Sequence, residues 1–250
     1  MATAPGWYGK LPTLGDFASR RLEPAFIEPW AAWLADGLAA QRSALGDAWV
    51  RAYLHSPAWR FVLMPGVIGQ GRTGAAWGGV LMPSVDQVGR YFPLTLAARL
   101  ATLPARVDEV EALLGWLQRL EDVAVDAMQD DWDIEQLEGV LATMAPDGRS
   151  GRAEDGAPAP DALADAIDAG AGFVDLAGVR NRSDLAAALV GALSHRAGPA
   201  WQQRAQGRSF WLADHPTQPR LLVRRGLPER TDVIEMLAGR SRDADATTLF

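Results

Sequence analysis

The hydrophobic pattern opens with a short aromatic segment followed by a long amphipathic stretch. Residues 6–12 are rich in glycine and aromatic side chains, which favours an opening strand that leads into a loop over 13–17. Residues 23–46 carry apolar side chains at spacings of three, four and seven, as expected for a helix with one apolar face. Residues 47–55 continue the helical pattern until Pro57 stops it.

The period of the apolar residues then changes from about 3.6 to two. Alternating apolar residues predict strands over 59–63, 77–82 and 92–96. The first two are apolar on both faces, which is typical of central strands covered on both sides. Their short connections favour an antiparallel meander, because a parallel crossover needs a dozen or more residues.

Helical periodicity returns after Pro104. Apolar stripes over 110–120 and 134–144 predict a helical hairpin that is broken near 130–132, with Asp130 or Asp131 capping the second helix. Residues 146–160 contain glycine and proline but no large apolar side chain, so we expect a mobile surface loop there.

The last third of the chain predicts one more helix and two strands. Leu185, Leu189 and Leu193 mark the helix. The strand candidates are 209–212 and 221–224, and we expect them to pair with the earlier sheet, because an isolated hairpin is only marginally stable in water.

Together these patterns predict an α+β protein with a mostly antiparallel sheet of about five strands flanked by helices. One domain over 1–240 is expected, with a polar, frayed tail over 241–250. Several of the ten tryptophans fall before residue 80, and most are expected in the core, because each can bury a large apolar area.

Composition excludes several classes of protein. With 24 Lys+Arg against 31 Asp+Glu, the net charge of −7 argues against a nucleic-acid binder. The chain has no cysteine, which excludes disulfides, thiolate nucleophiles and cysteine-bound metals. The longest uncharged run, 73–85, is too short for a membrane helix, and the N-terminus lacks the apolar core of a signal peptide. We therefore expect a cytoplasmic protein without membrane insertion.

Two binding motifs are incomplete. Residues 69–74 match the G-x-G-x-x-G pattern of dinucleotide sites but precede a predicted strand, whereas the mechanism needs a helix N-terminus; a glycine-rich hairpin turn fits better. Asp131, Asp133 and Glu135 imitate the start of a calcium loop, but Gln136 stands where glycine is required. No cofactor or metal site is predicted.

Catalytic signatures are missing as well. His55, His195 and His215 are not at metal-ligand spacing, and no serine lies in G-x-S-x-G. We therefore predict no catalytic residues and no enzyme activity, although an enzyme with scattered site residues stays open.

Eight carboxylates fall between Glu121 and Glu138, with no Lys or Arg among them. They fit the solvated faces of the helical hairpin, and a docking surface for a basic partner is the alternative.

Two segments resemble a known family. The first is Gly6-Trp7-Tyr8-Gly9-Lys10-Leu11-Pro12-Thr13-Leu14-Gly15-Asp16-Phe17. The second is Trp59-Arg60-Phe61 leading into Gly79-Val80-Leu81-Met82-Pro83-Ser84-Val85-Asp86-Gln87-Val88-Gly89-Arg90-Tyr91-Phe92-Pro93-Leu94. Over residues 6–98 the chain resembles the type VI secretion-associated TagF family, also called ImpM.

The resemblance implies a cytoplasmic regulator of type VI secretion. Family members are understood to repress secretion after translation by binding a forkhead-associated (FHA) scaffold protein. Some relatives carry a fused protein phosphatase, an activity that we do not expect of this chain. A structural or assembly component of the secretion apparatus is the alternative function.

Four charged residues of the two motifs are the candidate partner-binding residues: Lys10, Asp16, Asp86 and Arg90. Because they lie in loops flanking central strands, they either form internal ion pairs that pin the loops together or face a partner. The sequence Pro-Ser-x-Asp around Asp86 favours the internal role, since it suits side-chain-to-backbone turns. The aromatic residues Trp7, Phe17, Tyr91 and Phe92 are expected mainly in the core.

Overall fold

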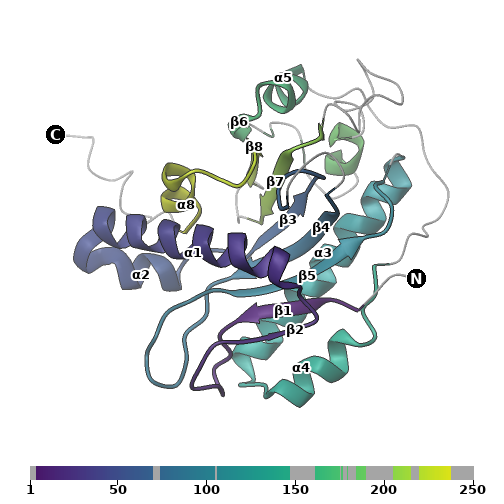
Figure 1. Cartoon of the computed structure of the whole chain (residues 1–250). Helices are drawn as coiled ribbons and strands as arrows, with labels where there is room; N and C mark the ends of the chain where they lie inside the picture. Colours follow the sequence, from purple (N-terminus) through teal and green to yellow (C-terminus); the bar gives the residue numbers. More distant parts are fainter. Residues whose placement is uncertain are drawn as a thin grey trace.

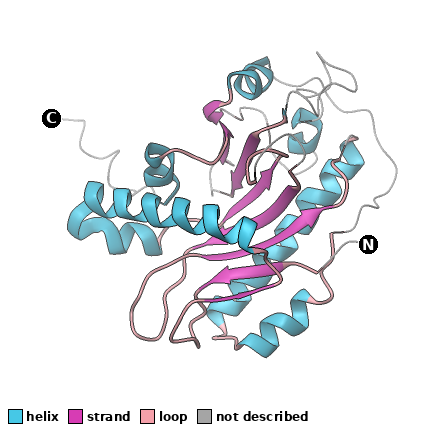
Figure 2. Cartoon of the chain, in the orientation of Figure 1, coloured by secondary structure: helices cyan, strands magenta, loops and turns pink. Residues whose placement is uncertain are grey.

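The computed structural model describes residues 4–69, 74–104, 106–146, 161–174, 176, 179, 184–189, 205–214 and 220–237. Within them an antiparallel sheet lies between helices on both of its faces (Figure 1; Figure 2). The predicted α+β class is therefore confirmed. The expected loop over 146–160, apart from Pro146, and the tail over 241–250 lie outside the described residues.

The sheet has eight strands in the described part of the chain, not about five. Its spatial order is β2-β1-β5-β4-β3-β7-β8-β6, and every neighbouring pair is antiparallel. The strands are β1 (Gly6–Gly9), β2 (Ala18–Arg20), β3 (Trp59–Leu63), β4 (Ala76–Met82), β5 (Leu94–Leu100), β6 (Ala171–Val174), β7 (Arg208–Ala213) and β8 (Arg220–Arg225).

The difference between the expected and the observed number of strands comes mainly from the two edge strands. β2 has three residues and β6 has four, which is too short for an alternating pattern to be recognised. The meander β3-β4-β5 is confirmed, and the late pair β7-β8 joins the sheet through β3, as expected.

The helices follow the predicted stripes closely in the first 150 residues. Residues 184–189, which include Leu185 and Leu189, are helical as expected, and Leu193 lies outside the described residues. Two further helices, α5 and α8, were not predicted. The helices are α1 (Pro24–Leu45), the 3-10 turn η1 (Gly46–Ala48), α2 (Trp49–Leu54), α3 (Val107–Gln129), α4 (Ile134–Leu141), α5 (Asp161–Ala169) and α8 (Arg230–Leu237).

The cap of α4 differs from the one expected. Asp133, rather than Asp130 or Asp131, accepts a hydrogen bond from the backbone N–H of Gln136, and the Gln136 side chain accepts one from the Asp133 amide. This reciprocal capping box satisfies two amide groups that a helix start leaves unpaired.

The central strands are buried on both faces because their alternate residues contact different helices. On β4, Trp77 and Leu81 pack into a cluster with Trp30 of α1. Val80 points to the other face and packs with Leu117 of α3. The period of two along β4 therefore divides its side chains between two cores.

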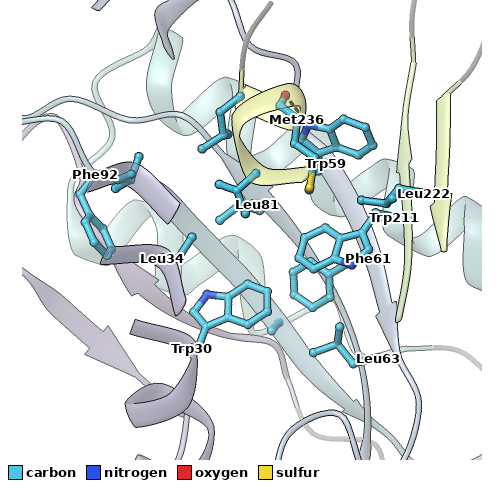
Figure 3. Close-up of a cluster of buried hydrophobic side chains, with 14 of the residues drawn as sticks. Trp30, Leu34, Trp59, Phe61, Leu63, Leu81, Phe92, Trp211, Leu222 and Met236 are labelled. Atoms are coloured by element: carbon cyan, nitrogen blue, oxygen red, sulfur yellow. Dashed lines mark hydrogen bonds between the residues drawn. The ribbon is translucent and has the colours of Figure 1, made fainter. Parts of the chain in front are cut away.

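An aromatic cluster between α1 and the sheet forms the largest core (Figure 3). The Trp30 ring lies 4.9 Å from that of Phe61 and 5.9 Å from that of Trp211, measured between centroids. Its Nε1 donates a hydrogen bond to Oγ1 of Thr95 at 2.8 Å. The described tryptophans are buried or half-buried, which confirms that most of them form the core.

Candidate functional site

The two motif loops emerge at the same end of the sheet. β1 runs antiparallel to β5 with Tyr8 opposite Thr95, and β4 runs antiparallel to β5 with Met82 opposite Leu94. The chain that leaves β1 and the chain that joins β4 to β5 therefore begin side by side. This register brings the loops of residues 10–17 and 83–93 together.

A buried ion pair joins the two loops. Nζ of Lys10 donates a hydrogen bond to Oδ2 of Asp86 at 2.6 Å, and both side chains are almost completely excluded from solvent. A lone buried charge is strongly unfavourable, so each of these residues needs the other. Lys10 and Asp86 thus form the internal ion pair that the sequence favoured. Partner binding by the four charged residues stays a prediction.

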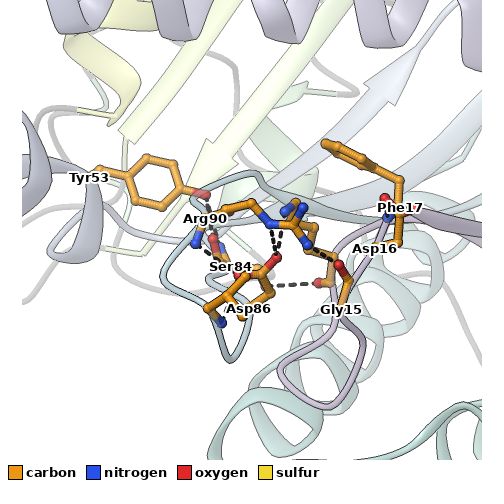
Figure 4. Close-up of polar contacts among 9 residues, drawn as sticks. Gly15, Asp16, Phe17, Tyr53, Ser84, Asp86 and Arg90 are labelled. Carbon is orange, nitrogen blue, oxygen red and sulfur yellow. Dashed lines mark hydrogen bonds and ion pairs between the residues drawn. The ribbon is translucent and has the colours of Figure 1, made fainter.

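Asp86 also organises its own loop (Figure 4). Its Oδ1 accepts hydrogen bonds from the backbone amides of Val88, at 3.1 Å, and Arg90, at 2.8 Å. Gly89 adopts a positive φ of 76° at the turn, and its amide donates to the Asp86 carbonyl. A side-chain carboxylate that accepts amides further along the chain is typical of tight turns.

Arg90 extends the network to the surface. Its Nε donates to Oδ2 of Asp86 at 2.8 Å, and its guanidinium also donates to the carbonyl of Gly15 in the other loop. Half of the Arg90 side chain stays exposed. The Asp86 carboxylate thus forms ion pairs with two cations, the buried Lys10 and the half-exposed Arg90.

The hydrogen bonds lower the pKa of Asp86. Burial would raise the pKa of this carboxyl, but the bonds from Lys10 and Arg90 outweigh burial and hold the pKa well below the ordinary aspartate value. Asp86 is therefore charged at neutral pH, as the paired cations require.

A second anchor connects the loops to α2. The Ser84 hydroxyl donates to the Lys10 carbonyl at 2.8 Å. The Tyr53 hydroxyl accepts from the Ser84 amide and donates to the Ser84 carbonyl, both at 3.0 Å. Burial raises the pKa of Tyr53, so its hydroxyl stays a donor. The sequence analysis did not single out either residue for this role, because nothing local indicates that α2 reaches the loop.

Asp16 lies apart from this network. Its Oδ1 accepts a hydrogen bond from the adjacent Phe17 amide at 2.8 Å, and the residue is exposed. Among the described residues, no hydrogen bond or ion pair joins Asp16 to Lys10, Asp86 or Arg90. The structure therefore brings three of the four candidate charges together.

The aromatic residues of the motifs divide into core and surface. Trp7 and Phe92 are buried and Tyr91 is half-buried, as expected. Phe17 was expected in the core but is 47% exposed. Its ring is nearly perpendicular to that of Phe92, at 4.8 Å between centroids, and Nζ of Lys10 lies 4.8 Å from the Phe17 centroid.

The acidic hairpin, which carries the eight carboxylates of residues 121–138, makes more internal contacts than its sequence indicates. Glu138 accepts hydrogen bonds from Nε1 of Trp7, at 2.6 Å, and from Arg21, so it ties α4 to the sheet. Glu121 lies 3.2 Å from Nε of Arg60 in a mostly buried position, and burial raises its pKa to about 7. The exposed carboxylates that remain are Asp122, Asp126, Asp130, Asp131, Asp133 and Glu135.

Candidate ligands for metals and cofactors are few. Nδ1 of His55 lies 2.7 Å from the Arg51 carbonyl, and His195 and His215 lie outside the described residues. No group of three or more His, Asp or Glu side chains suited to a metal ion occurs in the described ranges. Most of the glycine-rich segment 69–74 is likewise outside them.

The motif loops lie inside a region that matches a known family. A model of the TagF N-terminal domain, described as type VI secretion system-associated, matches residues 6–144. The chain belongs to the TagF family. The matched region holds β1 to β5 together with the hairpin of α3 and α4, and therefore the whole Lys10–Asp86–Arg90 cluster.

A solved structure supports the same relationship over nearly the full chain. The TagF-family chain is 32% identical to PA0076 from Pseudomonas aeruginosa PAO1, whose crystal structure it matches with a TM-score of 0.62 over 95% of each chain. No curated protein matches it. In the part of the TagF-family chain that the structure describes, no helix is both long and apolar enough to cross a membrane.

Proposed function

We propose that this TagF-family protein is a non-enzymatic, cytoplasmic repressor of a type VI secretion system, acting by stoichiometric binding of an FHA scaffold protein. The family match supports the association with type VI secretion. The observation that carries the binding role is the motif-loop cluster, in which the Asp86 carboxylate pairs with Lys10, 76 positions away along the chain, and with Arg90 of its own loop.

The chemistry of the cluster fits binding better than catalysis. Its buried members, Lys10 and Asp86, are paired with each other, so neither offers a free acid, base or nucleophile. What the cluster presents at the surface is a held guanidinium and two loops of defined shape. Such pre-organised loops favour protein recognition because little conformational entropy is lost on binding.

A purified binding titration tests the proposal. The FHA scaffold from the same type VI gene cluster is titrated by calorimetry at two salt concentrations, with both proteins shown to be folded. Saturable one-to-one binding is expected, with weaker affinity at high salt because charged groups take part. Absence of binding would contradict the scaffold-binding mechanism.

A secretion assay tests repression itself. Overproducing the protein in its own bacterium is expected to lower the amount of secreted type VI substrate without changing the level of the apparatus proteins. Matched overproduction of an Arg90→Glu variant, checked for folding, is the control. Co-purification of the protein with the assembled apparatus, rather than with the free scaffold, would instead indicate an assembly component.

A further inference from the structure

A few large apolar side chains are exposed in the described part of the chain. Among the described residues four such side chains stand out: Phe17 at 47%, Val50 at 38%, Leu54 at 51% and Val88 at 69% exposure. Phe17 and Val88 belong to the two motif loops, and Val50 and Leu54 to α2, which the Tyr53–Ser84 hydrogen bonds join to those loops. Exposed apolar side chains are ordinary singly, but Phe17 and Val88 lie on two loops that Arg90 joins, and such a pair is typical of a binding surface.

The two loop residues have charged neighbours of opposite sign. Asp16 directly precedes Phe17 and is exposed, and Arg90 follows Val88 by two residues with half of its side chain exposed. Arg90 is also fastened to both loops, through Asp86 and the Gly15 carbonyl. The two loops therefore present a carboxylate, two apolar side chains and a held guanidinium.

We infer that Phe17 and Val88, flanked by Asp16 and Arg90, form the docking surface for the protein partner, and that the partner presents an apolar contact between a carboxylate facing Arg90 and a basic group facing Asp16. This inference rests on the proposed function and adds the location and the chemistry of the contact. Lys10 and Asp86 are positioning residues in it, because their buried side chains hold the loops without reaching the surface. Complementary charge at the rim fixes orientation, while the apolar centre supplies most of the affinity.

The apolar residues of α2 make a matched control. Trp49 and Tyr53 face the loops, since both pack against Tyr91. Val50 and Leu54 each follow one of them by one position, which rotates them by about 100° around the helix. They are also apolar and exposed but lie off the helix face that packs on Tyr91, so the inference requires that they be dispensable.

Val88 allows the sharpest test, because its exposed side chain can be changed with little effect on the fold. Val88→Asp adds a charge that repels the expected partner carboxylate, whereas Val88→Lys is attracted to it. In titrations against the FHA scaffold, Val88→Asp is expected to bind at least about tenfold more weakly than Val88→Lys. Phe17→Ala is expected to weaken binding by about tenfold or more, as for a central aromatic contact.

The control variants are Val50→Ser with Leu54→Ser, and Asp126→Lys on the acidic hairpin. Both are expected to bind like the wild type, and circular dichroism and thermal unfolding confirm that every variant is folded. Equal affinities for Val88→Asp and Val88→Lys, or loss of binding in either control, would overturn the inference while leaving the proposed function intact. A wild-type protein that fails to bind the scaffold overturns both. Self-association that is abolished by Phe17→Ala would also overturn the inference, because a second copy of the chain would then occupy the surface.

Discussion

The ammonium group of Lys10 lies 2.6 Å from the carboxylate of Asp86, although 76 positions separate the two residues along the chain. Both side chains are buried, so the pair is an internal ion pair that connects the two family motifs and not a surface contact. An ion pair of this kind maintains the conformation of both loops, and its loss is expected to affect stability and binding together.

Removing both partners of this pair is expected to cost less than the sum of the two single removals. Lys10→Met leaves the Asp86 carboxylate with one cationic partner, Arg90, instead of two, and we expect Tm to fall by about 5 °C or more. Asp86→Asn leaves the ammonium buried without a counter-charge and has a similar effect. In a double-mutant cycle followed by thermal unfolding, the combined variant is expected to be less destabilised than the sum of the single changes. Simple additivity would show that the two side chains do not interact.

Stability at acid pH reports on Asp86. Its pKa in the folded chain is lowered below the ordinary value, so the folded state binds fewer protons than the unfolded state. The stabilisation is present above about pH 4, the ordinary aspartate pKa, and is lost as the pH falls towards the folded-state pKa. Urea unfolding between pH 2.5 and 7 is expected to show a shallower acid-side decline for Asp86→Asn than for the wild type. Identical slopes would exclude Asp86 as a source of acid sensitivity.

Glu121 gives the opposite pH dependence. Burial raises its pKa to about 7, with further contributions from Asp214 and Asp122, while Arg60 lowers it. The folded chain therefore holds a proton that the unfolded chain releases above about pH 4, so stability declines as pH rises through the window from about 4 to 7. Glu121→Gln is expected to flatten this decline in unfolding titrations, whereas Glu135→Gln, an exposed control on α4, leaves it unchanged. A decline that persists in Glu121→Gln counts against this assignment.

Gly9 is expected to tolerate no side chain. Its φ is 134°, and a Cβ there would lie 2.2 Å from the carbonyl oxygen of Pro93. We expect Gly9→Ala to lower the free energy of unfolding by about 2 kcal/mol or more, because strain and overlap add. The control is Gly139→Ala on an open face of α4, which is expected to stabilise by about 0.5–1 kcal/mol through helix propensity. Chemical denaturation measures both; a neutral Gly9→Ala would contradict the steric argument.

Glu138 is expected to behave as a structural residue despite its place in the acidic hairpin. It accepts hydrogen bonds from Trp7 and Arg21, so Glu138→Gln is expected to destabilise the protein by about 1.5–3 kcal/mol. Asp126→Asn, at an exposed position, is expected to change stability by less than about 0.5 kcal/mol. Equal effects in urea unfolding would remove the distinction between the two acids. Charge changes that probe the hairpin as a binding surface therefore belong at Asp126 and not at Glu138.

Features that depend on local periodicity could be predicted from the order of the residues. The stripes at three and four positions located α1, α3 and α4, and the alternation at Trp59, Phe61 and Leu63 located β3, because burial of one face imposes a regular spacing on neighbouring residues. The motif residues indicated the family, and Pro-Ser-x-Asp indicated the turn that Asp86 organises.

Contacts between distant residues could not be predicted in this way, because they depend on how the strands pair. The edge strands β2 and β6 are too short to show a period, and they exist because longer strands already present free edges to them. The exposure of Phe17 and the burial of Lys10 reverse the usual preferences of these residue types. Both follow from strand register, which places the ends of β1 and β4 beside the start of β5, so that Lys10 meets the Asp86 carboxylate and one side of Phe17 is left at the surface.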